Sequence, residues 1–414
     1  MSLQGPIVIV AEKPDGSLVE ALTAAGAFPV VEAGWADAAG AILSIRPSAV
    51  VLAEPACNRD AALALERQIA ASEPYLPVIA RTAENAAPAL ANALPVAADA
   101  PVERLVARLA SALRLRALHA TVIGRAARLE AERNILAEIP AADPLEDATV
   151  LVVGRGPAHP TLSVAVGERM GVMGALSIDF AAQCLNAREI DGIVIGDGLS
   201  PRMVVAMLVV LGEDARFREL PVTLLGPEER VDELPNLIHA RDPQVLVERL
   251  VPMVRARSFE SRLKRLLKSI ESKGMIDART GLLRIDAFGH DLARAVDDAA
   301  ERGIGLSVAR FSFDDALELR TSLDAARLMS RLMRSIDFAC RQDDGSIVAV
   351  FTGTDLRTAH VVARRLAGVL KHTMLRPNRE QAQIHATVTL ATLKPGDTPL
   401  TLMTRVAARR VAAE

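Results

Sequence analysis

Residues 331–351, RLMRSIDFACRQDDGSIVAVF, decide the fold of the last part of the chain. Apolar residues recur with helical spacing up to Ile336, which predicts a helix that ends near Asp337. Residues 338–341 and 346–351 have the composition of two short antiparallel strands. Asp344-Gly345 between them is a residue pair that favours the left-handed turn of a hairpin. The predicted order is therefore helix, strand, turn, strand.

Arg334 and Asp337 stand three residues apart where this helix passes into the first strand, and we expect both side chains to face solvent. A guanidinium can donate to O6 and N7 of guanine, while a carboxylate accepts from its N1–H and N2–H groups. The alternative is an ordinary surface ion pair. The same spacing recurs at Arg341 and Asp344, so the pair alone is a weak pattern.

The stretch RSIDFACRQDDGSIVAVF resembles the GGDEF family of diguanylate cyclases, in which an RxxD pair precedes the signature turn. Here DDGSI occupies the signature position. Upstream, IDARTGLLRIDAF at 276–288 is similar to the opening motif of the family, which Asp277, Thr280, Gly281 and Leu282 match. The resemblance covers about residues 275–414 and implies a degenerate GGDEF domain, a nucleotidyl-cyclase-like α+β fold.

The resemblance also implies that catalysis is lost. Arg310 stands where the family has a Mg²⁺-binding Asp, and Asp343 and Asp344 replace the two glycines that let GTP phosphates approach the backbone. We therefore expect no enzyme activity, no catalytic residue and no metal. What the resemblance carries over is the site for cyclic di-GMP, with Arg334, Asp337 and Arg365 as its residues.

The whole chain of 414 residues is long enough for two to four domains. Hydrophobic residues make up 50% and aromatic residues only 3%, so the cores must consist mainly of aliphatic side chains. We find neither a membrane-spanning segment nor an export signal, and the net charge of -3 gives no indication of DNA binding, so a cytoplasmic protein is expected. Cys57, Cys184 and Cys340 are predicted to be separate buried thiols.

Two doubly wound, flavodoxin-like parallel sheets are predicted upstream, each similar to a response-regulator receiver domain. In the first, residues 1–140 with an extended last helix, short buried strands alternate with Ala-rich helices. Glu12 and Glu54 stand where receivers have a metal ligand and the phosphoryl-accepting Asp. We interpret them as remnants that could hold a divalent ion or mimic a charged state, but not accept phosphate in the usual way.

The second receiver-like domain is predicted at residues 148–257 and a helical linker at 258–274. Gly154-Arg155 replaces the acidic pair after its first strand, and an arginine there would repel Mg²⁺. Asp197 falls at or one past the acceptor position, which leaves phosphorylation conceivable, although a loop role is the preferred interpretation.

Taken together, the resemblance implies a cyclic di-GMP effector that recruits proteins in cell-cycle control. It implies partners in a ClpXP-linked degradation pathway, factors for localisation to the cell pole, a homodimer through the receiver domains, and neither DNA binding nor membrane insertion. Two alternatives remain open: a residual diguanylate cyclase, and a response regulator or scaffold that acts through its receivers without nucleotide.

Overall fold

The computed structural model describes residues 4–13, 15–54, 58–83, 86, 88, 90–133, 142–226, 234–313, 317, 319–373 and 385–407. Internal contacts divide the chain into two compact units. The first comprises residues 1–128, 139–183 and 190–264, and the second comprises residues 129–138, 184–189 and 265–414.

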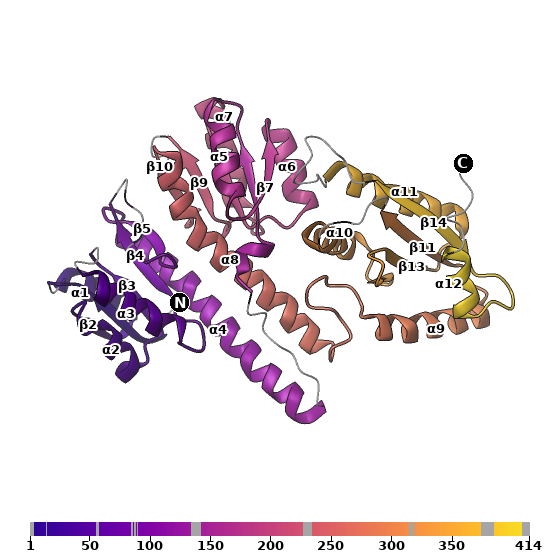
Figure 1. The fold of residues 1–414 in the computed structure, drawn as a ribbon, viewed down its shortest axis with the longest axis horizontal. Coiled ribbons are helices and arrows are strands. Elements are labelled where there is room, and N and C mark those ends of the chain that lie inside the picture. Colours follow the sequence, from indigo (N-terminus) through magenta and orange to yellow (C-terminus); the bar gives the residue numbers. More distant parts are fainter. Residues whose placement is uncertain are drawn as a thin grey trace. The chain divides into compact units, whose positions relative to one another are not determined.

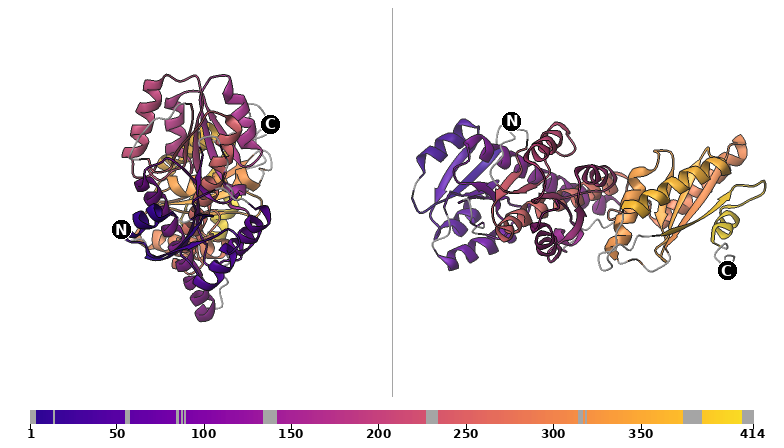
Figure 2. Two further views of the ribbon diagram at one scale, coloured as in Figure 1. Left: turned by 90° about the vertical axis from the view of Figure 1, so that its left-hand side faces the viewer. Right: turned by 90° about the horizontal axis from the view of Figure 1, so that it is seen from above.

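The first parallel sheet has five strands in the order β2-β1-β3-β4-β5. Its strands are β1 (Gln4–Val10), β2 (Phe28–Ala33), β3 (Ala49–Leu52), β4 (Val78–Thr82) and β5 (Leu94–Ala97). The helices are α1 (Gly16–Ala24), α2 (Ala38–Ile45), α3 (Arg59–Ala70) and α4 (Val102–Arg133). Alternate residues of β1 enter the cores on the two faces, Ile7 and Ile9 on one and Val8 and Val10 on the other. Helices cover both faces (Figures 1 and 2), as a parallel sheet requires.

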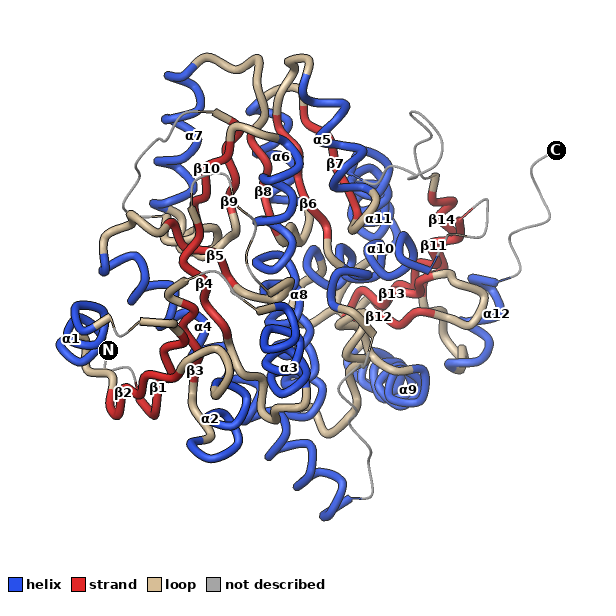
Figure 3. Tube along the Cα trace, turned by 60° about the vertical axis from the view of Figure 1, so that its left-hand side comes forward, coloured by secondary structure: helices blue, strands red, loops and turns tan. Residues whose placement is uncertain are grey.

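The second parallel sheet repeats this topology in the order β10-β9-β8-β6-β7 (Figure 3). Its strands are β6 (Thr149–Val153), β7 (Gly171–Ala175), β8 (Gly192–Ile195), β9 (Val222–Leu225) and β10 (Leu237–Ala240). The helices are η1 (Pro144–Asp147), α5 (Ala158–Gly167), α6 (Ile178–Ala187), α7 (Pro201–Glu213) and α8 (Pro243–Glu271). Read in chain order, both sheets follow the 2-1-3-4-5 order of flavodoxin-like folds, so this part of the predicted fold class is confirmed.

One hydrophobic cluster within the first unit contains residues of both parallel sheets. Leu105 and Leu109 of α4 pack in the same cluster as Ile238 of β10 and Met253 of α8. The last helix of each sheet therefore lies in the contact between them, because each supplies apolar side chains to a cluster that neither sheet completes alone.

The second unit contains an antiparallel sheet in the order β12-β13-β11-β14. Its strands are β11 (Leu306–Phe313), β12 (Phe338–Arg341), β13 (Ile347–Thr352) and β14 (Ala386–Thr392). Its helices are α9 (Ile285–Arg302), α10 (Leu319–Leu332), α11 (Leu356–Thr373) and α12 (Pro399–Ala407). The predicted α+β class and the predicted hairpin are confirmed, but α10 ends at Leu332 rather than near Asp337.

Successive side chains of each strand point to opposite faces, so this sheet has a hydrophobic core on each face. Ala309, Ile347 and Phe351 face α10 and α11, whereas Val308 and Val348 face α9 and α12. The sheet is thus the middle layer of three. The hairpin β12–β13 lies at one side of it, with β12 as the edge strand, and the turn after α10 and the turn between β12 and β13 lie at opposite ends of β12.

Cys184 and Cys340 are buried free thiols, as predicted, and Cys57 lies outside the described residues. Across the described parts of the chain, no helix combines the length and the apolar character needed to cross a membrane.

Candidate functional site

The turn that joins α10 to β12 presents the Arg-x-x-Asp pair. It is closed by a backbone hydrogen bond in which the Asp337 N–H donates to the Arg334 carbonyl, at 3.1 Å. Two hydrogen bonds connect the turn to Thr352 at the end of β13. The Thr352 N–H donates to Asp337 Oδ1 at 3.2 Å, and the Thr352 hydroxyl donates to the Ile336 carbonyl at 3.0 Å. The turn is therefore held by the sheet rather than by local sequence alone.

The two side chains of the pair lie in different environments. Arg334 is exposed, as predicted, but Asp337 is only 8% exposed, so the prediction that both face solvent is wrong for the carboxylate. Burial raises the pKa of Asp337, and the Thr352 N–H and the charge of Arg334 oppose this only in part. The site thus combines an exposed cation with a partly desolvated carboxylate that is held by hydrogen bonds. Ile336 between them is 62% exposed.

Arg365 lies on α11, which packs beside α10 on the same face of the sheet. Its side chain is exposed, as is that of its neighbour Arg364. The helix period explains this, because Ala363 and Leu366 face the core and leave the two arginines on the solvent side. The structure brings Arg334 and Asp337 into one turn, whereas it puts Arg365 on the neighbouring helix.

The opposite end of the hairpin carries an ion pair across strands. Arg310 of β11 donates through Nη2 to Asp344 Oδ2 in the turn between β12 and β13. Asp344 also accepts from the Ser346 N–H at 3.0 Å and from the Ser346 hydroxyl at 2.6 Å. Partial burial opposes ionisation of Asp344, but these hydrogen bonds and the charge of Arg310 outweigh it, so its pKa is lowered. Arg310, which we expected from the sequence in place of a metal ligand, is therefore engaged in an ion pair.

The second Arg-x-x-Asp spacing, at Arg341 and Asp344, does not form an ion pair. Asp344 pairs with Arg310 and not with Arg341, whose Nε instead donates to the Ser322 hydroxyl at 2.8 Å. Gly345 has φ +80°, as a left-handed hairpin turn needs.

The segment that matches the opening motif of the family forms a tight turn. The Thr280 hydroxyl donates to Asp277 Oδ2 at 2.6 Å, and the Asp277 N–H donates to the Leu282 carbonyl at 2.8 Å. Gly281 has φ +74°, and a Cβ there would lie 3.1 Å from the Ser330 hydroxyl. Both conditions favour glycine, so the motif has a structural role in this chain.

The three residues predicted as receiver remnants lie in different environments. Glu12 is exposed and Glu54 is half-buried, and each follows a strand of the first sheet. Asp197 is held in place, because its carboxylate accepts from the Ala158 N–H at the start of α5, at 3.2 Å. An anion at this position also interacts favourably with the helix dipole. Within the described ranges, no cluster of three or more His, Cys, Asp or Glu side chains is placed to hold a metal.

Neither a protein-family model nor a curated protein sequence matches the chain. Among solved structures, it is similar to the GGDEF domain of DgcB from Caulobacter crescentus in complex with c-di-GMP, with 21% identity and a TM-score of 0.30 over 32% of this chain and 86% of that one. It is also similar to the GGDEF domain of FimX from Pseudomonas aeruginosa, with 20% identity and a TM-score of 0.30 over 32% of this chain and 90% of that one. A third is the diguanylate cyclase SiaD from Pseudomonas aeruginosa in complex with its activator SiaC, with 19% identity and a TM-score of 0.31 over 35% of this chain and 60% of that one.

One residue of the site was missed from the sequence. Thr352 holds Asp337 through its N–H and Ile336 through its hydroxyl, although it lies fifteen residues beyond Asp337. From the sequence, Thr352 could have been found only through the pairing of the two hairpin strands. With the turn at Asp344-Gly345, the residue before β12 lies opposite the end of β13.

Proposed function

We propose that this chain is a catalytically inactive cyclic di-GMP effector whose residues 275–414 form a degenerate GGDEF domain. The observation that carries the proposal is the turn 334–337, in which an exposed guanidinium stands beside a carboxylate that the sheet holds in place. In its sequence of two receiver-like domains and a degenerate GGDEF domain, the chain resembles PopA, a relative of the cyclase PleD.

The recognition chemistry follows from the two groups. Arg334 would donate to the O6 and N7 acceptors of one guanine, and Asp337 would accept from the N1–H and N2–H donors of a guanine. Burial favours this second contact, because a carboxylate held away from bulk water interacts more strongly with a donor. Arg365 would reach the dinucleotide from α11, where an exposed guanidinium suits phosphate.

Absence of catalysis is proposed on the pair of Arg310 and Asp344. The guanidinium brings a fixed positive charge to the position where a cyclase would bind Mg²⁺, and like charge repels the ion. The carboxylates of Asp343 and Asp344 also add negative charge and side chains where GTP phosphates would have to approach the backbone. Each change alone would weaken substrate binding, and together they remove both metal and phosphate contacts.

The proposed biological role is that of an adaptor. The resemblance suggests recruitment to the cell pole and delivery of a transcriptional regulator to the ClpXP protease, with receiver-like domains that bind proteins. The proposed role involves neither DNA binding nor membrane insertion, and the expected compartment is the cytoplasm.

The central experiment is a calorimetric titration of the full chain with cyclic di-GMP. Arg334→Ala is expected to weaken binding by about tenfold to over a hundredfold, since a good bidentate contact to a base contributes about 1–3 kcal/mol. Arg331→Ala is the matched control, because Arg331 is also exposed and lies one helical turn earlier. Arg364→Ala serves as the same control for Arg365→Ala.

Two results would decide for the alternatives. Wild-type protein that shows no binding in the micromolar range would favour a protein-binding scaffold or response regulator. Formation of cyclic di-GMP from GTP with Mg²⁺ or Mn²⁺ would make the chain a residual cyclase and refute the proposed loss of catalysis.

A further inference from the structure

Helix α7 of the first unit (Figure 1) is apolar on the side that faces solvent as well as on the side that faces the core. Its inner side is formed by buried side chains, Val204, Met207, Leu208 and Leu211. Its outer side is formed by exposed apolar side chains, Met203, Val205, Ala206, Val209 and Val210. A surface helix normally carries polar residues on its outer side. A contiguous exposed apolar patch is instead typical of a site that binds another molecule.

One charge of each sign bounds this outer side. Arg202 lies at the start of α7 and Glu213 at its end, and both side chains are exposed. Among the described residues, neither side chain forms an ion pair. Each charge also stands at the end of the helix where the helix dipole disfavours it. The two charges therefore do not stabilise α7 itself.

Arg202 and Glu213 belong to one stripe along the outer side. Positions 202, 206, 209 and 213 are spaced by four, three and four residues, which is the spacing of a seam between two packed helices. Along the stripe, the order is a cation, Ala206, Val209 and an anion. An apolar centre is thus flanked by opposite charges.

The stripe is complementary to itself when a second copy of α7 runs antiparallel to it. A two-fold axis at the midpoint places Arg202 opposite Glu213 of the second copy, and Ala206 opposite Val209 of the second copy. Each charge then also meets the helix end of the second copy that the dipole favours. A parallel pair would place arginine against arginine and glutamate against glutamate. The small side chain of Ala206 allows a close approach of the two helices near the axis.

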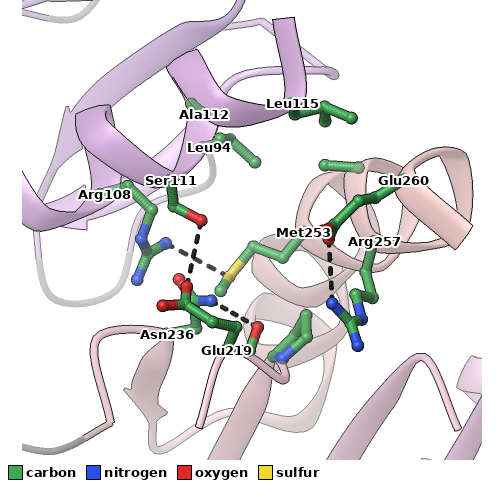
Figure 4. Close-up of a pocket in the computed structure, with 12 residues that line it drawn as sticks. Leu94, Arg108, Ser111, Ala112, Leu115, Glu219, Asn236, Met253, Arg257 and Glu260 are labelled. Carbon is green, nitrogen blue, oxygen red and sulfur yellow. Dashed lines mark hydrogen bonds and ion pairs between the residues drawn. The ribbon is translucent and has the colours of Figure 1, made fainter. Parts of the chain in front are cut away.

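The last helix of each parallel sheet, in contrast, already has its partner within the chain. Figure 4 shows Met253 of α8 near Leu94 and Ala112, with which it shares one hydrophobic cluster. Nη1 of Arg108 on α4 lies 3.5 Å from the sulfur of Met253. No described residue of α7 belongs to this cluster. A contact through α7 therefore leaves the internal contact between the sheets intact.

We propose that α7 of the second receiver-like domain joins two copies of this chain in an antiparallel, two-fold symmetric contact. The apolar side chains provide the attraction. Arg202 and Glu213 set the orientation, because exposed ion pairs add little affinity whereas like charges placed together oppose association. A contact between two helices of 13 residues is smaller than the standard interface, so the dimer is expected to be weak, with a Kd in the micromolar range. This contact goes beyond the proposed function and does not depend on it.

The test measures the mass of the full chain by sedimentation equilibrium without nucleotide, from low micromolar to several hundred micromolar protein. Wild type is expected to change from monomer to dimer over this range. Val209→Asp should weaken dimerisation by about a hundredfold or more, because each copy then brings an unpaired carboxylate into an apolar contact. Val164→Asp is the matched control and should dimerise like wild type, since Val164 is an exposed valine on α5 of the same domain.

Exchange of the terminal charges tests the orientation. Arg202→Glu and Glu213→Arg each place like charges together on both sides of the axis, so each should weaken dimerisation about tenfold. The double variant Arg202→Glu/Glu213→Arg restores opposite charges across the axis and should return to within about threefold of wild type. A dimer that neither single variant weakens, or that the double variant fails to restore, would refute the antiparallel pairing.

Two other results would overturn the proposal as a whole. One is a wild-type chain that stays monomeric throughout, which would assign the outer side of α7 to a different partner. The other is a dimer that Val209→Asp leaves unchanged. Melting curves at a concentration where all variants are monomeric check that Val209→Asp is folded.

Cyclic di-GMP titration separates this contact from the proposed function. Val209→Asp should bind the dinucleotide like wild type, because α7 belongs to the first unit and the turn 334–337 to the second. Loss of dimerisation with retained nucleotide binding supports the contact, whereas a dimer that binds no nucleotide would refute only the proposed function.

Discussion

Replacement of Asp337 separates the structural role of this carboxylate from its proposed role in binding. In Asp337→Ala, the Thr352 N–H loses an acceptor at 3.2 Å in a place that is largely closed to water. In Asp337→Asn, the amide oxygen can still accept from Thr352, and the charge is gone. Asp337→Ala therefore removes both the hydrogen-bond acceptor and the negative charge, whereas Asp337→Asn removes only the charge.

The magnitudes follow from these contacts. A buried donor left without a partner costs about 1–3 kcal/mol, so Asp337→Ala should be less stable than Asp337→Asn by that amount. For a domain of this size, about 2–4 °C of melting temperature corresponds to 1 kcal/mol, which predicts a difference of roughly 2–12 °C. Because burial raises the pKa of Asp337, its ionisation costs stability at neutral pH, and Asp337→Asn should melt no lower than wild type.

The assay is a thermal melt of the full chain at neutral pH, with cyclic di-GMP titrations of the same samples. Both variants are expected to lose affinity, but only Asp337→Ala should lose stability. Equal melting temperatures for the two variants would refute the assigned hydrogen bond. Wild-type affinity in Asp337→Asn would refute the role of the charge.

Three further predictions rest on other parts of the structure. Affinity for cyclic di-GMP should fall as pH falls through the raised pKa of Asp337, because only the ionised carboxylate accepts both hydrogen bonds from guanine. Below that pKa, the loss of affinity should approach about tenfold per pH unit. Calorimetry should find this pH dependence absent in Asp337→Asn. Asp197→Ala should lower the free energy of unfolding by about 0.5–2 kcal/mol, because the Ala158 N–H loses its acceptor. In wild type, mass spectrometry after treatment with acetyl phosphate should find no phosphate on Asp197. Burial raises the pKa of Cys340 to about 12, so its peptide should remain unmodified by a thiol reagent in native protein and react after denaturation.

Much of the fold follows from the sequence because its signals are local. Strands of four or five aliphatic residues between helical stretches predict parallel sheets, and residues 49–52 and 94–97 form strands over the predicted bounds. The Asp344-Gly345 pair likewise placed the hairpin turn, since a glycine with positive φ is a property of the turn itself.

The candidate site was harder to predict because its environment depends on distant residues. Nothing near Asp337 in the sequence indicates that Thr352 donates to it, so its burial was missed. The partner of Asp344 is decided across the sheet, where β11 and β13 place Arg310 near the turn, and not by the spacing to Arg341. The end of α10 was also placed too late, since Ile336 continues the helical apolar pattern but lies exposed in the turn.

The contact between the two parallel sheets has a consequence for self-association. Arg108 of α4 donates across it to the Pro235 carbonyl, and Arg249 of α8 donates across it to the Ala86 carbonyl. The faces built from the last helix of each receiver-like domain already contact each other within one chain. A tethered partner acts at an effective concentration of about millimolar, whereas a second copy in solution is present at far lower concentration. A homodimer that used these faces would first have to break the internal contact, so any association between copies should occur through other surfaces, and its strength should increase when Arg108 or Arg249 is replaced.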